Sequence, residues 1–226
     1  PEELYAGLSA WAGLRDVAFD RSSFRDPILN LLDHDNNEVR AAALLSLSVF
    51  DHKSEDLGRA IMMADDPSEQ VQKAVIQSLF LLGGGDLTGE SGHVAHEILR
   101  SVDKPEREWF GSLWGAKFTP ELQDLFLNWA GSGAGLKTSS EGYNVMYYSL
   151  STLQNKGPAT VDFLIECLSS HDTTNIAGRA AWGLSYGVAP GAESEQKIAD
   201  AAIEIIRNRT DAYLRKQLFK SLQLYG

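Results

Sequence analysis

A small residue followed by leucine recurs along the chain, each time near the end of a segment with helical hydrophobic spacing. Successive leucines of these pairs are 31 to 40 residues apart. We number each segment from the residue eight places before the leucine, which is repeat position 0. Positions 0, 4, 7 and 8 share one face of a helix with 3.6 residues per turn. The pairs are Gly13-Leu14, Ser46-Leu47, Ser78-Leu79, Ser112-Leu113, Thr152-Leu153, Gly183-Leu184 and Ser221-Leu222.

Shorter amphipathic segments lie between these helices, and no strand-like alternation competes with them. Each of these segments is the first helix of a two-helix unit, and each segment that ends in a small-Leu pair is the second. The first helices are predicted at about 24–33, 54–65, 91–101, 119–130, 158–169 and 192–208. Residues typical of helix starts precede the second helices, because Asp, Asn, Ser and Thr cap helix N-termini and Pro fits the first turn. The pattern therefore predicts an all-α chain in which a helix-turn-helix unit occurs six times after an initial half repeat.

Residues 35–47, DNNEVRAAALLSL, resemble a HEAT-type repeat, in particular the short bacterial form first known from bilin lyases. Residues 66–79 and 172–184 keep the Asp, the Val or Ile, and the final small-Leu pair. Arginine follows position 0 at Arg40 and Arg215. The resemblance implies an α-solenoid, a right-handed superhelix of about six to seven repeats. It says little about function, since such arrays serve as scaffolds, adaptors, lyases and a few DNA enzymes.

Two glycine-rich insertions, 83–92 and 131–142, interrupt an array that we expect to form a single domain over 1–226. The second insertion departs from a phosphate-binding loop, because Leu136 separates Gly135 from Lys137 and the preceding segment is helical. A flexible loop is the favoured interpretation. Both ends of the chain are apolar, although solenoids usually carry polar capping repeats. We therefore expect a piece cut from a longer chain, or ends that other segments cover.

Charge and cysteine content narrow the possible functions. The chain has 226 residues, 20 Lys and Arg against 31 Asp and Glu, a net charge of −11 and one cysteine. This balance argues against general nucleic-acid or anionic-membrane binding. A single cysteine excludes an internal disulfide framework and a multi-cysteine zinc site. No apolar run is long enough to span a bilayer, and no signal peptide is visible, so we expect a soluble protein and slightly favour the cytoplasm.

The outward positions of the second helices carry a biased set of side chains. With positions 0, 4, 5, 7 and 8 buried, positions 2, 3, 6 and 9 face outward, and the resemblance implies that they line the concave side. Six of the seven charged residues at these positions are cations. Cations and aromatics suit an acidic or aromatic-bearing partner. The expected binding residues are Lys73, Arg107, Trp114, Tyr147, Arg179, Trp182, Lys216 and Lys220. A register shift of one residue would instead bury Trp114, and large aromatics usually belong in the core.

Candidate catalytic and metal-binding residues are few. His93, His96 and Glu97 have helical spacing, but no motif supplies a third metal ligand, so two surface histidines are the simpler interpretation. Cys167 lies in an apolar stretch and is predicted to be a core residue. We expect no catalytic residue, no metal and no cofactor.

These observations favour a non-catalytic scaffold that binds a protein or peptide on its concave face. One alternative is a repeat-based enzyme of the bilin-lyase or alkylpurine DNA glycosylase type, in which Trp109, Trp114 and Trp182 would stack on a base. Another is a structural spacer that contacts only the remainder of its own, larger chain. Sequence alone leaves these alternatives open.

Overall fold

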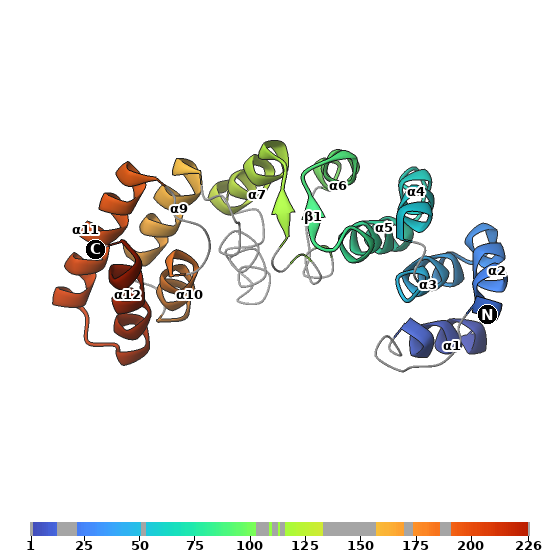
Figure 1. The fold of residues 1–226 in the computed structure, drawn as a ribbon, viewed down its shortest axis with the longest axis horizontal. Coiled ribbons are helices and arrows are strands. Elements are labelled where there is room, and N and C mark those ends of the chain that lie inside the picture. Colours follow the sequence, from blue (N-terminus) through green and yellow to red (C-terminus); the bar gives the residue numbers. More distant parts are fainter. Residues whose placement is uncertain are drawn as a thin grey trace. The chain divides into compact units, whose positions relative to one another are not determined.

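The computed structural model describes residues 2–12, 22–50, 53–102, 109, 113, 116–132, 157–169, 174–185 and 191–225. The described chain is an all-α helical-repeat protein of the α-solenoid class, as the spacing predicted (Figure 1). It divides into two compact units, Pro1–Asp103 and Lys104–Gly226, each with its own helices and core. The expectation of one continuous right-handed superhelix over 1–226 stays a prediction.

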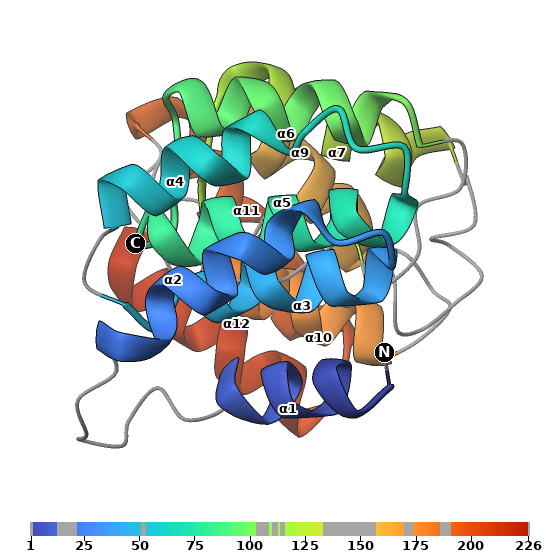
Figure 2. The same cartoon turned by 90° about the vertical axis from the view of Figure 1, so that its right-hand side faces the viewer.

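The N-terminal unit contains two rows of helices. First helices of the repeats are α2 (Ser22–Asn30), α4 (Lys53–Met62) and α6 (Glu90–Arg100), with a short 3-10 turn, η1 (Leu31–Asp33), after α2. Second helices are α1 (Glu2–Ala12), α3 (Asn37–Leu47) and α5 (Glu69–Leu82). Helix α3 packs between α1 and α5, and the first helices lie along the other side of this row (Figures 1 and 2).

The C-terminal unit repeats this arrangement. First helices α9 (Pro158–Ser169) and α11 (Ala192–Asn208) pack against second helices α10 (Thr174–Leu184) and α12 (Ala212–Tyr225). Helix α7 (Pro120–Ser132) precedes α9 in this unit. Two strands of two residues each lie among the described helices, β1 (Asp86–Leu87) in the N-terminal unit and β2 (Lys117–Phe118) in the C-terminal unit. Apart from these strands, the predicted ranges of the first helices agree with the described ones to within a few residues. The predicted second helices that contain Ser112-Leu113 and Thr152-Leu153 lie almost entirely outside the described residues.

The small residue at repeat position 7 lies where two neighbouring second helices pack closely. Ser46, Ser78 and Ser221 are fully buried there. The Ser46 hydroxyl donates to the Ala42 carbonyl oxygen at 2.7 Å and lies 3.2 Å from the carbonyl oxygen of Leu8 in α1. Position 7 therefore faces the preceding second helix, where a larger side chain would hold the two helices apart.

A cluster of polar contacts joins α3 to the start of α5. The Arg40 guanidinium forms two hydrogen bonds with the Asp66 carboxylate, at 2.9 and 3.0 Å, and the two side chains are 16% and 11% exposed. Arg40 also donates to the carbonyl oxygens of His34 and Asp35 at its own helix entry. The hydrogen bonds from Arg40 hold the pKa of Asp66 below its ordinary value. Arginine at position 1 thus ties one repeat to the next.

The first glycine-rich insertion is a tight turn followed by a helix start. Gly84 and Gly85 have positive φ angles of 62° and 85°, which glycine adopts without a steric penalty. The chain then enters β1, and α6 begins at Glu90, inside the insertion. Of the second insertion, 131–142, only the last two residues of α7 belong to the described part of the chain.

Candidate functional site

The structure brings together two of the predicted binding residues, Lys216 and Lys220, on the outer face of α12. Lys216 is exposed and Lys220 is half-buried. Both line a depression of about 540 Å³ with five further residues, of which Arg215 and Phe219 are the most distinctive. The remaining lining residues are Thr210, Ala212 and Gln223. We call this surface the α12 face.

The other predicted binding residues do not join this surface in the described part of the chain. Lys73 is 21% exposed and pairs with Glu69 on its own helix at 2.8 Å, so its charge is locally compensated. Trp182 is half-buried in α10. Arg179 belongs to α10, but its side chain lies outside the described set. Arg107, Trp114 and Tyr147 lie outside the described residues altogether.

The assignment of outward and buried positions needs correction at several places in the repeat. Positions 2 and 9, expected to face outward, are buried at Ala41 and Ser185, which are 4% and 6% exposed. Position 3 is buried, because Ala42, Ala74 and Gln217 are 4%, 3% and 6% exposed. Position 5, expected to be buried, is 50% exposed in α12, where it is Phe219. The physical reason is that position 3 points toward the preceding second helix, as position 7 does. Position 5 is covered only where another helix packs against it.

Local sequence explains how the α12 face is displayed. The Asp211 carboxylate accepts a hydrogen bond from the backbone N–H of Leu214 at 2.7 Å, which caps the start of the helix. Leu214 and Leu218 are fully buried and fix the inner face of the helix. Residues three to four places apart then form an outer row, since they follow the helical period. Arg215, Lys216, Phe219 and Lys220 are presented along this row.

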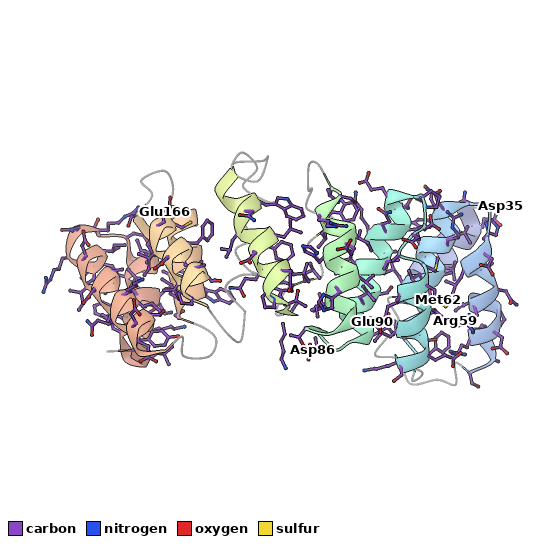
Figure 3. All side chains as sticks on the ribbon, turned by 90° about the horizontal axis from the view of Figure 1, so that it is seen from above. Asp35, Arg59, Met62, Asp86, Glu90 and Glu166 are labelled. Carbon is purple, nitrogen blue, oxygen red and sulfur yellow. The ribbon has the colours of Figure 1, made fainter. Side chains whose placement is uncertain are left out.

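Helix α12 differs in its charged residues from the other described helices. Its sequence, AYLRKQLFKSLQLY, contains three cations and no acid, in a chain with a net charge of −11. Among the described residues no carboxylate forms a salt bridge with Arg215 or Lys216. Elsewhere exposed acids are common, and Figure 3 labels Asp35, Asp86, Glu90 and Glu166 at the surface. A cationic helix on an acidic protein attracts an acidic ligand, and Phe219 offers an apolar contact beside the charges.

Sequence reasoning missed Arg215 and Phe219 as members of this surface. Arg215 stands at position 1, the position at which Arg40 contacts the next repeat, and this equivalence was visible in the sequence. Phe219 stands at position 5, which was assigned to the core. Whether position 5 is covered depends on the helices that surround it in space, which a repeat pattern does not reveal.

A second depression, of about 600 Å³, lies between the α4–α5 turn and α6, with His93, Glu97, Asp65 and Asp66 among its lining residues. His93 is exposed and His96 half-buried. Glu97 pairs with Arg100, and His96 lies 3.5 Å from Glu97. Within the described ranges no three His, Cys, Asp or Glu side chains are grouped as a metal site requires. Asp66 is already engaged by Arg40.

Two residues considered for chemistry are buried. Cys167 is 6% exposed within the core of the C-terminal unit, as predicted from its apolar surroundings. Trp109, one of the three tryptophans that a base-stacking site would use, is 3% exposed. No described helix combines the length and the apolar character needed to cross a membrane.

The comparisons with known proteins find helical-repeat architectures among solved structures. No protein-family model and no curated protein matches the sequence. A designed armadillo repeat protein in complex with the peptide (KR)4 is 13% identical, with a TM-score of 0.45 over 100% of this chain and 92% of that chain. An engineered protein is 14% identical, with a TM-score of 0.44 over 98% of this chain and 90% of that chain. Both likenesses are weak, and the fold assignment rests on the helices themselves.

Proposed function

We propose that this chain is a non-catalytic scaffold of HEAT-like repeats that binds an acidic protein or peptide, with the α12 face as its principal binding surface. The observation that carries the proposal is the concentration of cationic side chains around an exposed phenylalanine on one helix of an otherwise acidic protein. Arginine and lysine bind carboxylates, while an aromatic side chain anchors a partner by burying apolar area.

The chemistry of the α12 face favours binding over catalysis. Lysine, arginine, glutamine and threonine supply hydrogen-bond donors. None of the described side chains lining the depression is a carboxylate, a histidine or a cysteine. These are the groups that most often act as general acids, general bases and nucleophiles. Lysine and threonine also do so when a neighbouring base or desolvation activates them, but Lys216 and Thr210 are exposed to solvent. A surface of donors around an aromatic anchor is typical of recognition.

Charge reversal of the α12 face tests this function. A fluorescein-labelled acidic peptide of twelve residues or so, rich in Glu and Asp and with one central Trp, serves as the probe in an anisotropy titration. The double variant Lys216→Glu/Lys220→Glu is expected to weaken binding about tenfold or more, because like charges then face the peptide. Raising the salt concentration is expected to weaken binding to the unaltered chain.

The matched control makes the same change of charge elsewhere. Lys53 and Arg207 are exposed cations on α4 and α11. The variant Lys53→Glu/Arg207→Glu is expected to bind the peptide with an affinity within about twofold of the unaltered chain, the reduction due to net charge alone. Equal losses in the two variants would mean that the α12 face is not the site. Absence of binding to the unaltered chain would contradict the proposed function.

A further inference from the structure

The second depression lies within the N-terminal unit, at the junction of two successive repeats, and we call it the α4–α6 groove. One wall is the end of α4 and the turn that follows it, with Ile61 and residues 64–67. The other wall is one face of α6, whose lining residues follow the helical period. The α6 residues in this wall are His93, Val94, Glu97, Ile98 and Ser101.

Both walls of the α4–α6 groove contribute apolar side chains. Ile61 of α4 and Val94 of α6 are half-buried, and Ile98 is 5% exposed. Met62 follows Ile61 and is the last residue of α4. Its side chain is 81% exposed, and Figure 3 labels it on this helix. Apolar area that is partly open to water is stabilised when a partner covers it, and exposed methionines adapt their shape to such partners.

The charged side chains that line the groove are all acidic, apart from His93. They are three carboxylates, with no lysine or arginine among the described lining residues. Arg40 engages Asp66, and Glu97, which is exposed, pairs with Arg100 at the surface. Asp65 is exposed and forms no salt bridge with any residue of the described ranges. Its negative charge is therefore available to a ligand that enters the groove.

The backbone adds to the preference for a cation. Ile61 lies in the last turn of α4 and Ile98 in the last turn of α6, so the groove adjoins the C-terminal ends of two helices. The C-terminal end of a helix carries partial negative charge and favours a nearby cation. The N-terminal end of α5 has the opposite sign, but the Asp66 carboxylate already accepts a hydrogen bond from the Ser68 N–H there, at 2.9 Å.

We propose that the α4–α6 groove binds an arginine side chain presented by a basic segment of a partner protein. The guanidinium would pair with Asp65, and with Glu97 in exchange with Arg100. The methylene stem of the arginine would cover Ile61 and Val94. This inference goes beyond the proposed function, since the groove lies on other helices than the α12 face and takes a ligand of opposite charge.

The chemistry of the groove favours arginine over a bare cation. Within the described ranges no three His, Cys, Asp or Glu side chains are grouped to hold a metal ion, and a metal would leave the apolar walls uncovered. A guanidinium is weakly hydrated and planar, so it binds carboxylates while its stem covers apolar area. The turn itself gives an example, because Arg40 forms two hydrogen bonds with the carboxylate of Asp66.

A matched pair of peptides tests the proposal. The first is a fluorescein-labelled peptide of about ten residues in which two arginines flank a leucine within glycines and serines. In the second, citrulline replaces both arginines, which keeps the shape and removes the charge. Anisotropy titrations of the full chain in about 50 mM salt compare their affinities. We expect the arginine peptide to bind at least about tenfold more tightly than the citrulline peptide.

The variant Asp65→Asn/Glu97→Gln is expected to remove this difference, because it removes both exposed carboxylates of the groove and leaves Arg100 without its partner. Both side chains are exposed, so we expect the fold to persist, and circular dichroism checks this. The matched control is Glu193→Gln/Glu204→Gln, which removes two exposed carboxylates from α11. It should change the affinity for the arginine peptide by less than about twofold.

Amide chemical shifts in nuclear magnetic resonance locate the site independently. The arginine peptide is expected to shift the amides of residues 61–67 and 93–101 most strongly. The variant Lys216→Glu/Lys220→Glu should still bind this peptide, with an affinity at least equal to that of the unaltered chain, because the α12 face takes no part.

Four results would overturn the inference. Equal losses in the two carboxylate variants would mean that the peptide is attracted by the net charge of the chain and not by the groove. Equal binding of the arginine and citrulline peptides would exclude pairing with the carboxylates. The largest shifts at amides outside the two segments would place the site elsewhere, and failure of the arginine peptide to bind would remove it. None of these results bears on the proposed function, whose probe is an acidic peptide.

Discussion

Helices α3 and α12 carry the same entry signals and differ in what lies beside them. In α3 the arginine at position 1 is engaged by Asp66 and the leucine at position 5 is buried. In α12 the arginine pairs with no described carboxylate and the phenylalanine is half exposed. The same side-chain types are thus engaged within the fold at one helix and are less covered at the other. Neighbouring structure, rather than residue type, decides whether they are covered.

Substitution of the apolar residue at position 5 is expected to give the largest difference in the free energy of unfolding between the two helices. Leu44→Ala should lower the free energy of unfolding by about 3 kcal/mol, because it leaves a cavity in a closed core. Phe219→Ala should lower it by less than about 1 kcal/mol, since half of the ring is already in water. Urea denaturation followed by circular dichroism measures both. Similar losses in the two variants would show that Phe219 is packed in the folded protein.

Substitution of the arginine at position 1 is expected to give the next largest difference in the free energy of unfolding. Arg40→Gln should cost about 2 kcal/mol, because it removes charge-assisted hydrogen bonds and leaves a mostly buried carboxylate without its partner. Arg215→Gln should change stability by no more than about 0.5 kcal/mol. The same denaturation experiment compares them. A loss at Arg215 as large as that at Arg40 would mean that Arg215 is engaged within the chain.

Acid titration isolates the contribution of Asp66. Its folded-state pKa lies below the ordinary value because Arg40 donates hydrogen bonds to the carboxylate. The unfolded chain therefore binds this proton more readily, and the stabilisation is complete above the ordinary pKa and is lost as the pH falls through the folded-state pKa. The stability difference between the unaltered chain and Asp66→Asn should be constant from about pH 5 to 7 and shrink below about pH 4.

The smallest expected change in the free energy of unfolding comes from a substitution at the junction between α10 and α12. A methyl group on Gly178 would lie 3.0 and 3.1 Å from two ring carbons of Tyr213, which is 45% exposed. Alanine is favoured over glycine inside a helix by about 1 kcal/mol, and the displaced ring offsets part of this gain. Gly178→Ala should therefore change stability by less than about 0.5 kcal/mol. In a Tyr213→Ala background it should stabilise by about 1 kcal/mol.

Much of the architecture was predictable because it depends on local signals. The small-leucine pair, the helix-capping residues and the hydrophobic period determine which segments are helical, and each acts within a few residues. The burial of Cys167 followed from its apolar neighbours in the same way. The pairing of Arg40 with Asp66 was not predicted, although the arginine at position 1 and the aspartate at the next helix entry both belong to the repeat pattern.

The proposed binding surface was predictable only in part, because the exposure of a side chain depends on its neighbours in space. Lys216 and Lys220 were placed correctly on an outer face, since no described helix covers positions 2 and 6 there. Lys73 occupies an equivalent position, but Glu69, one turn earlier, neutralises it. Phe219 was assigned to the core because position 5 is buried wherever a further helix packs against it. A repeat pattern assigns the same exposure to a position in every repeat, so it cannot identify the repeat in which that position is uncovered.

The ties between repeats also determine how the chain can fold. Arg40 and Asp66 are 26 residues apart in sequence, Asn37 and Ser68 are 31 apart, and Arg209 and Leu168 are 41 apart. Because such contacts close loops of modest length, the entropic cost of forming each repeat junction is similar along the array. Folding can then begin at any hairpin of the described repeats that is stable enough and extend to its neighbours.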